Sequence, residues 1–336
     1  MRESICVLGS GAWGTALAVH LNRNAHRVML WSRRPETAQQ MRDTMLNPRL
    51  PGVVLPYTIR HSSDLACVQG HKLVVVSVPS FAVRETCRAF APYLDDDAVL
   101  ISAAKGIEPG TGLRMSQIIA EETGRRVAVL SGPSHAEEVS RGIPTGLVVA
   151  CEDRQLAERI QDAFASVRLR VYSSPDVVGA ELGGALKNVI ALCAGIGDGM
   201  GYGDNARALL MTRGLTEMAR LGMAMGSRPE TFAGLTGVGD LIVTCCSMHS
   251  RNRRCGILIG QGKDPKEAVQ EVGMVVEGMY TADAAYRLAK KLGVEMPITE
   301  AIYKVVQGEV SAADAVHALM TRARKGENET LVKDLL

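Results

Sequence analysis

The first feature with chemical consequences is a glycine-rich turn near the N-terminus. The apolar run SICVLG passes directly into Gly9, Gly11 and Gly14, and TALAVHLNRNAH then has the pattern of a helix. In this order of strand, turn and helix, Gly9 makes the tight turn, Gly11 lets the backbone approach a pyrophosphate, and Gly14 allows close helix–strand packing. The diphosphate would lie at the helix N-terminus. The pattern predicts a dinucleotide site, the alternative being a turn that binds no ligand.

A second apolar run, RVMLW, ends in Ser32, Arg33 and Arg34. At this place a site that prefers NAD has an Asp or Glu that binds the ribose 2′-hydroxyl. Two guanidinium groups would instead pair with the 2′-phosphate of NADP. We expect Arg33 and Arg34 to bind the cofactor, with NADP preferred and NAD possible. Otherwise they are ordinary exposed arginines at a strand end.

Lys187 is the only cation in the stretch GAELGGALKNVIALCAGIGDG. A lysine ammonium can stabilise the negative charge that develops on a ketone oxygen during hydride addition, and it can donate a proton to that oxygen. On a helix, Lys187 shares its face with small or aliphatic residues: Ala180, Gly183, Gly184, Ile190, Ala191 and Ala194. The lysine would lie on a partner there, or the low surface would leave space for a small substrate and a nicotinamide ring.

Polar turns follow two further apolar runs. Lys105 comes after AVLISAA, and RVAVL leads into Gly132, Ser134, His135 and Ala136. In an open α/β sheet, ligands bind beyond the carboxyl ends of the strands. We therefore expect Lys105 to bind a ligand. His135 is an alternative proton donor, because histidine titrates near neutrality.

Arginines crowd the start of a predicted helix, RNRRCGILIG. If Ser250 caps this helix, its first turn lies where the helix dipole is already positive. That turn contains Arg251, Arg253 and Arg254. A bound anion would relieve the repulsion, with Asn252 as a neutral donor. Alternatively, the arginines pair with carboxylates of the other domain.

Asp240 begins the segment DLIVTCC and has two possible roles. It would cap a helix, or it would bind a lysine or a substrate hydroxyl. A cluster of possible metal ligands follows it: Cys245, Cys246, His249 and Cys255. Adjacent cysteines seldom bind one ion, and no second C-x-x-C or H-x-x-x-H accompanies them, so we expect no metal site.

The elements that must position these residues change character along the chain. Up to about residue 172, β-branched runs alternate with helical patterns, which is typical of a parallel sheet covered on both faces. After about residue 180, only periodic helical segments follow. The predicted fold class is α/β: an N-terminal Rossmann-type, doubly wound sheet in residues 1–178, then an all-α C-terminal domain in residues 179–336. The polar tail TRARKGENETLVKDLL is expected to be a last helix or a frayed end.

Composition limits the partners. With 38 Lys+Arg against 36 Asp+Glu, nothing favours nucleic acid, so any anion recognised should be small and bound locally. The N-terminal MRESICVLG lacks the features of a secretory signal, and we expect no membrane segment. Eight cysteines without C-x-x-C spacing are typical of reduced thiols, which indicates a cytoplasmic protein. A homodimer is expected from its prevalence among soluble enzymes.

Seven motifs occur along nearly the whole chain in this order: LGSGAWGTALA, SAAKGIEPGTG, LSGPSHAEE, ELGGALKNVIA, GVGDLIVTC, HSRNRR and VVEG. In content and order they resemble the bacterial-type NAD(P)-dependent glycerol-3-phosphate dehydrogenases. The resemblance implies a Rossmann domain followed by a helical domain. It also implies reversible hydride transfer between NAD(P)H and dihydroxyacetone phosphate, giving sn-glycerol 3-phosphate for phospholipid synthesis.

The resemblance also implies residue roles, with Lys187 in proton transfer. Residues implied at the substrate are Lys105, Gly132, Ser134, Lys187, Asp240, Ser250, Arg251 and Asn252. Residues implied at the cofactor are Ala12, Trp13, Arg33, Lys105, Ala136, Arg251, Val275 and Glu277, beside Gly9, Gly11, Gly14 and Arg34 of the arguments above. Relatives often have Ser at the position of Ala12; a contact through the backbone amide would survive this change.

Two other functions fit parts of the sequence. One is an NADP-dependent dehydrogenase of a small hydroxy acid, which also uses a lysine on a helix but has no need of the arginine-rich helix start at Ser250. The other is a non-catalytic NADPH sensor, which would bind the cofactor without turnover and would have no use for Lys187.

Overall fold

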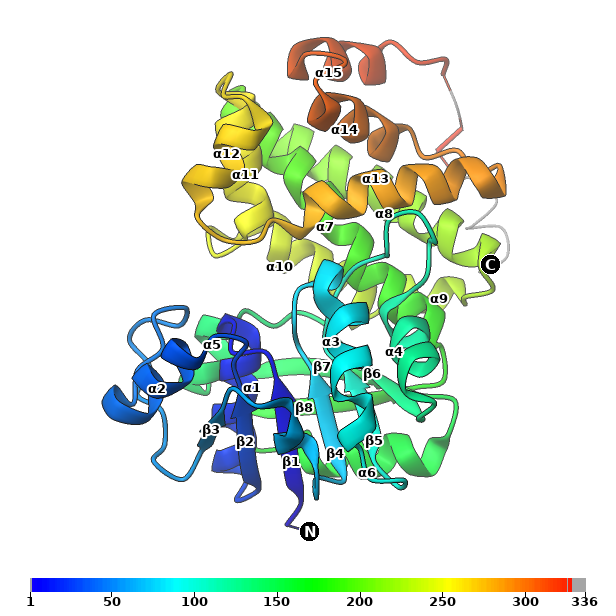
Figure 1. Ribbon diagram of the computed structural model, residues 1–336. Coiled ribbons are helices and arrows are strands. Elements are labelled where there is room, and N and C mark those ends of the chain that lie inside the picture. The colour runs from blue at the N-terminus through cyan, green and yellow to red at the C-terminus, as the bar shows by residue number, and fades with distance from the viewer. Residues whose placement is uncertain (1, 325, 328–336) are drawn as a thin grey trace. The chain divides into compact units, whose positions relative to one another are not determined.

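The computed structural model describes residues 2–324 and 326–327, and the chain forms two compact units (Figure 1). The first unit comprises Met1–Lys105 and Met115–Val177, and the second comprises Gly106–Arg114 and Val178–Leu336. Most of the polar tail predicted to be a last helix or a frayed end lies outside the described residues.

An eight-stranded sheet forms the centre of the first unit, in the order β3-β2-β1-β4-β5-β6-β7-β8. Its strands are β1 (Ser4–Leu8), β2 (Arg27–Trp31), β3 (Arg60–Ser62), β4 (Leu73–Val76), β5 (Val99–Ser102), β6 (Val127–Ser131), β7 (Thr145–Ala150) and β8 (Leu169–Ser174). Neighbouring strands are parallel except β6 and β7, which are antiparallel. The predicted α/β sheet is confirmed, with this one reversal.

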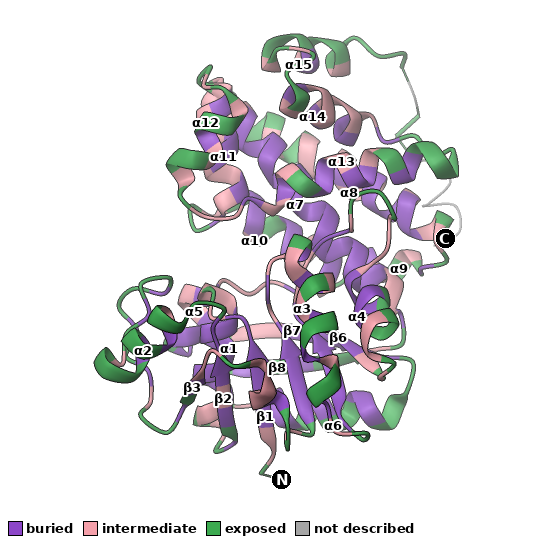
Figure 2. Ribbon diagram, viewed as in Figure 1, coloured by how far each residue is buried: buried purple, intermediate pink, exposed green. Residues whose placement is uncertain are grey.

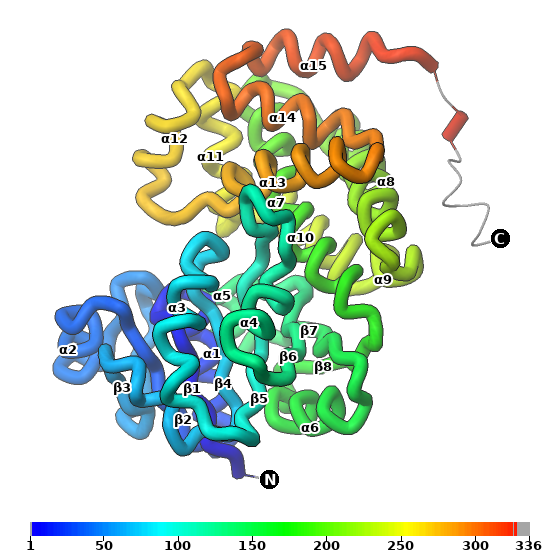
Figure 3. Tube along the Cα trace, turned by 45° about the vertical axis from the view of Figure 1, so that its right-hand side comes forward, coloured from blue at the N-terminus to red at the C-terminus, as the bar shows by residue number. Residues whose placement is uncertain are grey.

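Helices cover both faces of the sheet. They are α1 (Ala12–Arg23), α2 (Pro35–Thr44), α3 (Val83–Phe90), α4 (Met115–Thr123), α5 (Ala136–Arg141) and α6 (Arg154–Phe164), with short 3₁₀ helices η1 (Leu65–Val68), η2 (Ser80–Ala82) and η3 (Ala91–Tyr93). Ile5 and Val7 of β1 share one core with residues of α1, α5 and α6. The alternate residues Cys6 and Leu8 point to the opposite face. There α3 and α4 lie side by side (Figure 3), and β4 and β5 are buried (Figure 2).

Helices are the regular elements of the second unit among its described residues, beside one isolated β-bridge between Ile107 and Arg114. Its elements are α7 (Val177–Gly199), α8 (Asp204–Ala224), α9 (Pro229–Phe232), the π-helical turn η4 (Leu235–Gly239), α10 (Asp240–Cys246), α11 (Arg251–Gly260), α12 (Pro265–Val272), α13 (Glu277–Leu292), α14 (Pro297–Gln307) and α15 (Ala312–Met320). The predicted all-α C-terminal domain is confirmed. Every residue of α7 between Gly179 and Ile196 is buried (Figure 2), so α7 is the core helix of this unit.

The length and composition of α7 are those of a helix that could cross a membrane. Among the described residues, α7 is a single helix long and apolar enough to cross a membrane, and α9–α10 with α11 would be a second only as a pair bent by 51°. In α7, 83% of the apolar window is buried inside the protein. A helix that is apolar on all sides is buried either in a protein core or in a membrane. Because α7 is buried by the protein itself, it is a core helix.

The short segment Gly106–Arg114, which lies between two parts of the first unit in the sequence, belongs to the second unit. Ile107 is 1% exposed in the core of that unit, and the Arg114 guanidinium pairs with the Glu181 carboxylate of α7. A Cβ placed on Gly112 would lie 3.3 Å from a methyl group of Leu288 in α13. The sequence-based division at residue 178 places this segment in the first domain, whereas its apolar and charged side chains have their partners in the second unit.

Candidate active site

The glycine turn of the first unit joins β1 to α1. Gly9 has a φ of +115°, and a Cβ on it would lie 2.8 Å from the backbone of Ser77. A Cβ on Gly14 would lie 1.9 Å from the carbonyl oxygen of Gly9. The backbone conformation and the close packing of α1 therefore require glycine at both positions.

Gly11 differs from these two glycines. A Cβ there would meet no atom within 4 Å, and its φ of −66° is open to any residue. Packing within the protein therefore does not require glycine at this position. A pyrophosphate bound against this backbone would require it, because a side chain would occupy the space that the pyrophosphate needs. The helix α1 also begins without a side-chain cap. Both observations fit the diphosphate of a dinucleotide bound at this helix end.

The end of β2 lies beside this turn. Ser32 is 1% exposed, and its hydroxyl forms a hydrogen bond with that of Ser10. Arg33 and Arg34 follow and are exposed. The rim therefore presents two cations where an NAD-preferring site has a carboxylate.

Three predicted residues meet at the carboxyl ends of β5 and β6. The Lys105 ammonium and the Ser134 hydroxyl each donate a hydrogen bond of 3.0 Å to the carbonyl oxygen of Gly132. Gly132 has a φ of +125°, which favours glycine. His135 is the N-terminal cap residue of α5, and Ala136 is its first residue.

Lys187 lies in α7 and is 7% exposed. Its ammonium forms an ion pair with the fully buried Asp240 and donates a hydrogen bond of 2.8 Å to the Thr244 hydroxyl. That hydroxyl donates to the backbone carbonyl of Asp240 over 2.6 Å, so its lone pairs are available to the lysine. The cap residue of α10 is Gly239. The expected helix-cap role of Asp240 is therefore wrong, and its alternative role as the partner of a lysine is confirmed.

Protein atoms fill the low surface around Lys187. A Cβ on Gly183 would lie 2.2 Å from the carbonyl oxygen of Thr236 in η4. The remaining small residues of the predicted stripe are buried as well: Ala180, Gly184, Ala191 and Ala194. The expectation that Gly183 keeps space for a substrate and a nicotinamide ring is wrong, because the glycine instead lets η4 approach α7.

The same helix packs backbone to backbone on α11. A Cβ on Gly195 would lie 2.1 Å from the carbonyl oxygen of Arg253, and a Cβ on Gly256 would lie 2.1 Å from that of Leu192. This close contact fixes the position of the N-terminal turn of α11 relative to Lys187.

Ser250 caps α11, as predicted, by accepting a hydrogen bond of 3.2 Å from the backbone N–H of Arg253. The Arg253 side chain does not need an external anion. Its Nε donates to Asp198 of α7 over 2.7 Å, and a terminal N–H donates to the carbonyl oxygen of Cys246 over 2.7 Å. One of the three arginines is therefore neutralised by a carboxylate of its own unit, not of the other domain.

Asn252 connects three helices. Its Nδ2 donates to the amide oxygen of Asn188 in α7 over 2.9 Å, and its Oδ1 accepts from the Gly278 N–H in α13 over 2.8 Å. Val275 and Glu277, predicted at the cofactor, lie half-buried at the start of α13. Ala12 and Trp13, also predicted there, begin α1 in the first unit.

Two sequence models of one family match most of the chain. The N-terminal domain of NAD-dependent glycerol-3-phosphate dehydrogenase matches residues 4–157, and its C-terminal domain matches residues 176–317. The chain belongs to the NAD-dependent glycerol-3-phosphate dehydrogenase family. It is therefore an oxidoreductase that uses NAD(P).

Individual relatives of this family match end to end. A glycerol-3-phosphate dehydrogenase (NAD(P)+) from Moorella thermoacetica is 56% identical over 98% of this chain and 99% of its own. One from Geobacillus kaustophilus is 52% identical, covering 98% and 97%. The crystal structure of glycerol-3-phosphate dehydrogenase from Coxiella burnetii superposes with a TM-score of 0.92 at 38% identity, covering 96% and 99%. A D-mandelate dehydrogenase bound to NADH, at 14% identity and a TM-score of 0.63, shares the fold alone.

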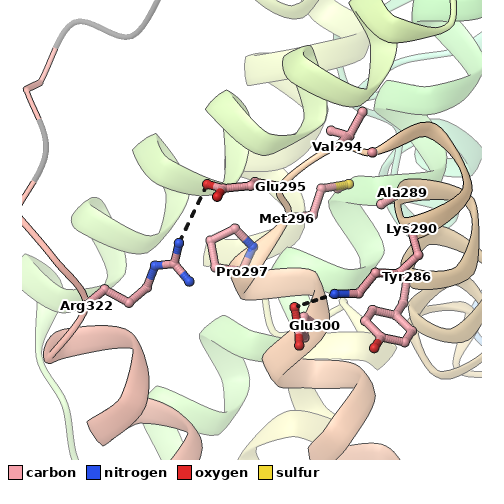
Figure 4. Close-up of a pocket in the computed structure, with 10 residues that line it drawn as sticks. Tyr286, Ala289, Lys290, Val294, Glu295, Met296, Pro297, Glu300 and Arg322 are labelled. Carbon is pink, nitrogen blue, oxygen red and sulfur yellow. Dashed lines mark hydrogen bonds and ion pairs between the residues drawn. The ribbon is translucent and has the colours of Figure 1, made fainter.

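A pocket of about 310 Å³ lies in another part of the chain, at the junction of α13 and α14 (Figure 4). Glu295 pairs with Arg322 over 3.7 Å, and Lys290 pairs with Glu300 over 3.5 Å. None of the described residues that line it belongs to the predicted site, and its charges are paired. The pocket is therefore separate from the residues of the candidate site.

The sequence analysis missed two residues of the second unit's polar network, Thr244 and Asn188. Thr244 comes four residues after Asp240, and i,i+4 spacing on a helix was a signal that could have found it. Asn188 follows Lys187 directly, but nothing in the sequence connects it with Asn252, 64 residues further along the chain.

Proposed function

We propose that this chain reversibly transfers a hydride between NAD(P)H and dihydroxyacetone phosphate, giving sn-glycerol 3-phosphate for glycerophospholipid synthesis. The observation that carries the proposal is the buried Lys187 ammonium, held between Asp240 and Thr244. A structural lysine has little reason to be buried at the cost of desolvating two charges. The similar glycerol-3-phosphate dehydrogenases of Moorella thermoacetica and Geobacillus kaustophilus support the same reaction.

Lys187 has the proton-transfer role in this proposal. The bound nicotinamide supplies or accepts the hydride. As the hydride bonds to the carbonyl carbon, the carbonyl electron pair moves to oxygen, where the ammonium stabilises the charge and donates one proton. In the opposite direction, Lys187 takes that proton back from the alcohol. Asp240 and Thr244 fix the ammonium, which lowers the cost of orienting it during the reaction.

Each unit contains candidate residues for the substrate. In the second unit, Ser250, Arg251 and Asn252 lie at the N-terminus of α11, where the helix dipole is positive. In the first unit, Lys105, Gly132 and Ser134 already meet at the ends of β5 and β6. We assign these six residues, with Lys187 and Asp240, to the substrate.

The cofactor assignment follows the glycine turn. The open space at Gly11 and the exposed Arg33 and Arg34 support a dinucleotide with a 2′-phosphate, so NADP is preferred over NAD. Residues 1–178 would form the dinucleotide-binding domain and residues 179–336 the substrate-binding domain, and the assignments also give each ligand some residues of the other domain. The further cofactor residues are Ala12, Trp13, Lys105, Ala136, Arg251, Val275 and Glu277. A cytoplasmic location and a homodimer complete the proposal.

Replacing Lys187 tests the central assignment. With dihydroxyacetone phosphate as substrate, NADPH oxidation at 340 nm should occur in the wild type, and Lys187→Ala should lower kcat by about 10²–10⁴-fold because proton transfer is lost. Lys291→Ala, which removes an exposed lysine of α13, is the matched control and should leave kcat unchanged. A wild type without a substrate-dependent rate would overturn the proposed reaction. Full activity in Lys187→Ala would overturn only the role of the lysine.

Replacing Arg251 tests the phosphate assignment. Arg251→Ala should raise the KM for dihydroxyacetone phosphate by about 10–100-fold, because charge-assisted hydrogen bonds contribute about 1.5–3 kcal/mol. Arg254→Ala removes one cation from the same helical turn and should change this KM little. An unchanged KM in Arg251→Ala would argue for a substrate without phosphate, such as a small hydroxy acid.

A further inference from the structure

Asn47 contacts the glycine turn from a distant part of the chain. It lies between α2 and β3 and is 2% exposed. Its Nδ2 donates to the backbone carbonyl of Ser10 over 2.9 Å and to the Thr15 hydroxyl over 2.7 Å. One buried amide therefore joins the middle of the glycine turn to the first part of α1.

The segment around Asn47 holds this amide in place. Its Oδ1 accepts a hydrogen bond of 2.9 Å from the Arg49 N–H, and its backbone carbonyl accepts one of 2.9 Å from the Leu50 N–H. Leu50 is 1% exposed in the core beneath the sheet face that carries α1. A compact turn anchored in the core therefore fixes the position from which Asn47 donates.

The hydrogen bond from Asn47 to the Ser10 carbonyl also orients the N–H of Gly11, because both groups belong to one peptide unit. A trans peptide is planar, and its C=O and N–H point to opposite sides. When Asn47 holds the Ser10 carbonyl, the Gly11 N–H must point away from Asn47. A Cβ built on Gly11 would find no protein atom within 4 Å, so the surroundings of this residue are open. This is where a dinucleotide diphosphate would accept backbone hydrogen bonds.

We propose that Asn47 is a positioning residue for the cofactor: it holds the Ser10 carbonyl and thereby aims the Gly11 N–H at the diphosphate of NAD(P)H. The inference rests on the proposed function only for the identity of the cofactor. A loss of the Asn47 donors would let this peptide rotate, and binding of the diphosphate would weaken while binding of the adenosine end would not.

The test compares two isosteric substitutions at opposite ends of α1. Asn47→Asp keeps the acceptor for the Arg49 N–H but cannot donate to Ser10 or Thr15. Asn24→Asp is the matched control, because Asn24 also donates from Nδ2 to backbone carbonyls, those of Ala163, Phe164 and Ala165, at 3.1, 3.4 and 3.1 Å. Each change removes amide donors near one end of α1, and only that at Asn47 faces the glycine turn.

The readout is the Kd of the full-length protein for NADPH, by fluorescence titration, beside that for adenosine 2′-monophosphate, which lacks the diphosphate. Asn47→Asp should weaken NADPH binding about 10-fold or more, and Asn47→Ala should do the same without a new charge. The adenosine 2′-monophosphate Kd should stay within about twofold of wild type. Asn24→Asp should lower the thermal midpoint and leave both Kd values unchanged.

Two outcomes would overturn the inference: wild-type NADPH affinity in Asn47→Ala, or equal losses for the two ligands in the Asn47 variants. An equal loss in Asn24→Asp would do so as well, because binding would then follow stability. The titration needs no turnover. If NADPH binding depends on Asn47 but dihydroxyacetone phosphate is not reduced, the positioning role stands and the proposed reaction fails.

Discussion

Thr244 contacts both Lys187 and Asp240 through its hydroxyl, which accepts a hydrogen bond from the Lys187 ammonium and donates one to the backbone carbonyl of Asp240. Thr244→Val keeps the shape and removes both bonds. We expect kcat to fall by about 10-fold or more, because hydrogen bonds to charged groups contribute about 1.5–3 kcal/mol. Thr244→Ser restores the hydroxyl and should recover most of the rate in the same 340 nm assay. A valine variant with the wild-type kcat would show that Asp240 alone orients the lysine.

Sequence reasoning could reach single residues but not their partners. Lys187 stood out as the one cation of an apolar stretch, and binding of a lysine was one of the roles left open for Asp240. The pairing of Arg253 with Asp198 could not be predicted, because it joins residues 55 positions apart and depends on how closely α11 packs on α7. The sequence therefore favoured three unpaired arginines at the start of α11, whereas Arg253 is paired with Asp198.

At the scale of elements, the contact of α7 with α11 depends on glycine. Gly195→Ala would place a Cβ 2.1 Å from the Arg253 carbonyl oxygen, so we expect the free energy of unfolding to fall by about 2 kcal/mol or more. Gly197→Ala lies in the same helix, but its Cβ would be 3.7 Å from Tyr202, an ordinary contact. It should be neutral or stabilising by up to about 1 kcal/mol, because alanine favours the helix. Urea unfolding of the two variants measures the difference; equal stabilities would contradict the packing argument.

Most elements of the sheet could be predicted because each has its own apolar run. The exception is β3, whose three residues Arg60–Ser62 pair only with β2 at the sheet edge and need no apolar run. The direction of β7 could not be predicted either. A buried strand has the same apolar character in both directions, so only the spatial path through α5 decides that it runs antiparallel to β6.

At the scale of the whole molecule, stability should depend on the ionisation of Glu217. This carboxylate of α8 is 3% exposed and accepts hydrogen bonds from the backbone N–H groups of Ile298 and Thr299, at 2.6 and 3.2 Å. Burial nevertheless raises its pKa from 4.5 to about 7. The folded protein thus keeps a proton that the unfolded chain releases. This contribution is complete below about pH 4.5 and is lost as the pH rises through 7.

The free energy of unfolding should therefore fall by about 3 kcal/mol over that range on account of Glu217. Three histidines act in the opposite sense, since burial lowers the pKa of His61 to about 4 and also lowers that of His20 and His71. The histidines change the free energy of unfolding mainly below about pH 6.5, the pKa of histidine in the unfolded chain. Urea unfolding between about pH 6.5 and 8 should show a decline in the wild type and a flatter curve in Glu217→Gln. Parallel curves would exclude Glu217 as the cause.

The segment Gly106–Arg114 is synthesised long before the residues of the second unit on which it packs. Gly112 and Arg114 leave the ribosome early, but Leu288, which lies against Gly112, and Glu181, the partner of Arg114, are made up to about 180 residues later. At about 5–20 residues per second, the segment must wait roughly 10 to 35 s for the last of them. During this interval the first unit can close around the sheet while Ile107 still lacks the core of the second unit, in which it is buried in the complete chain.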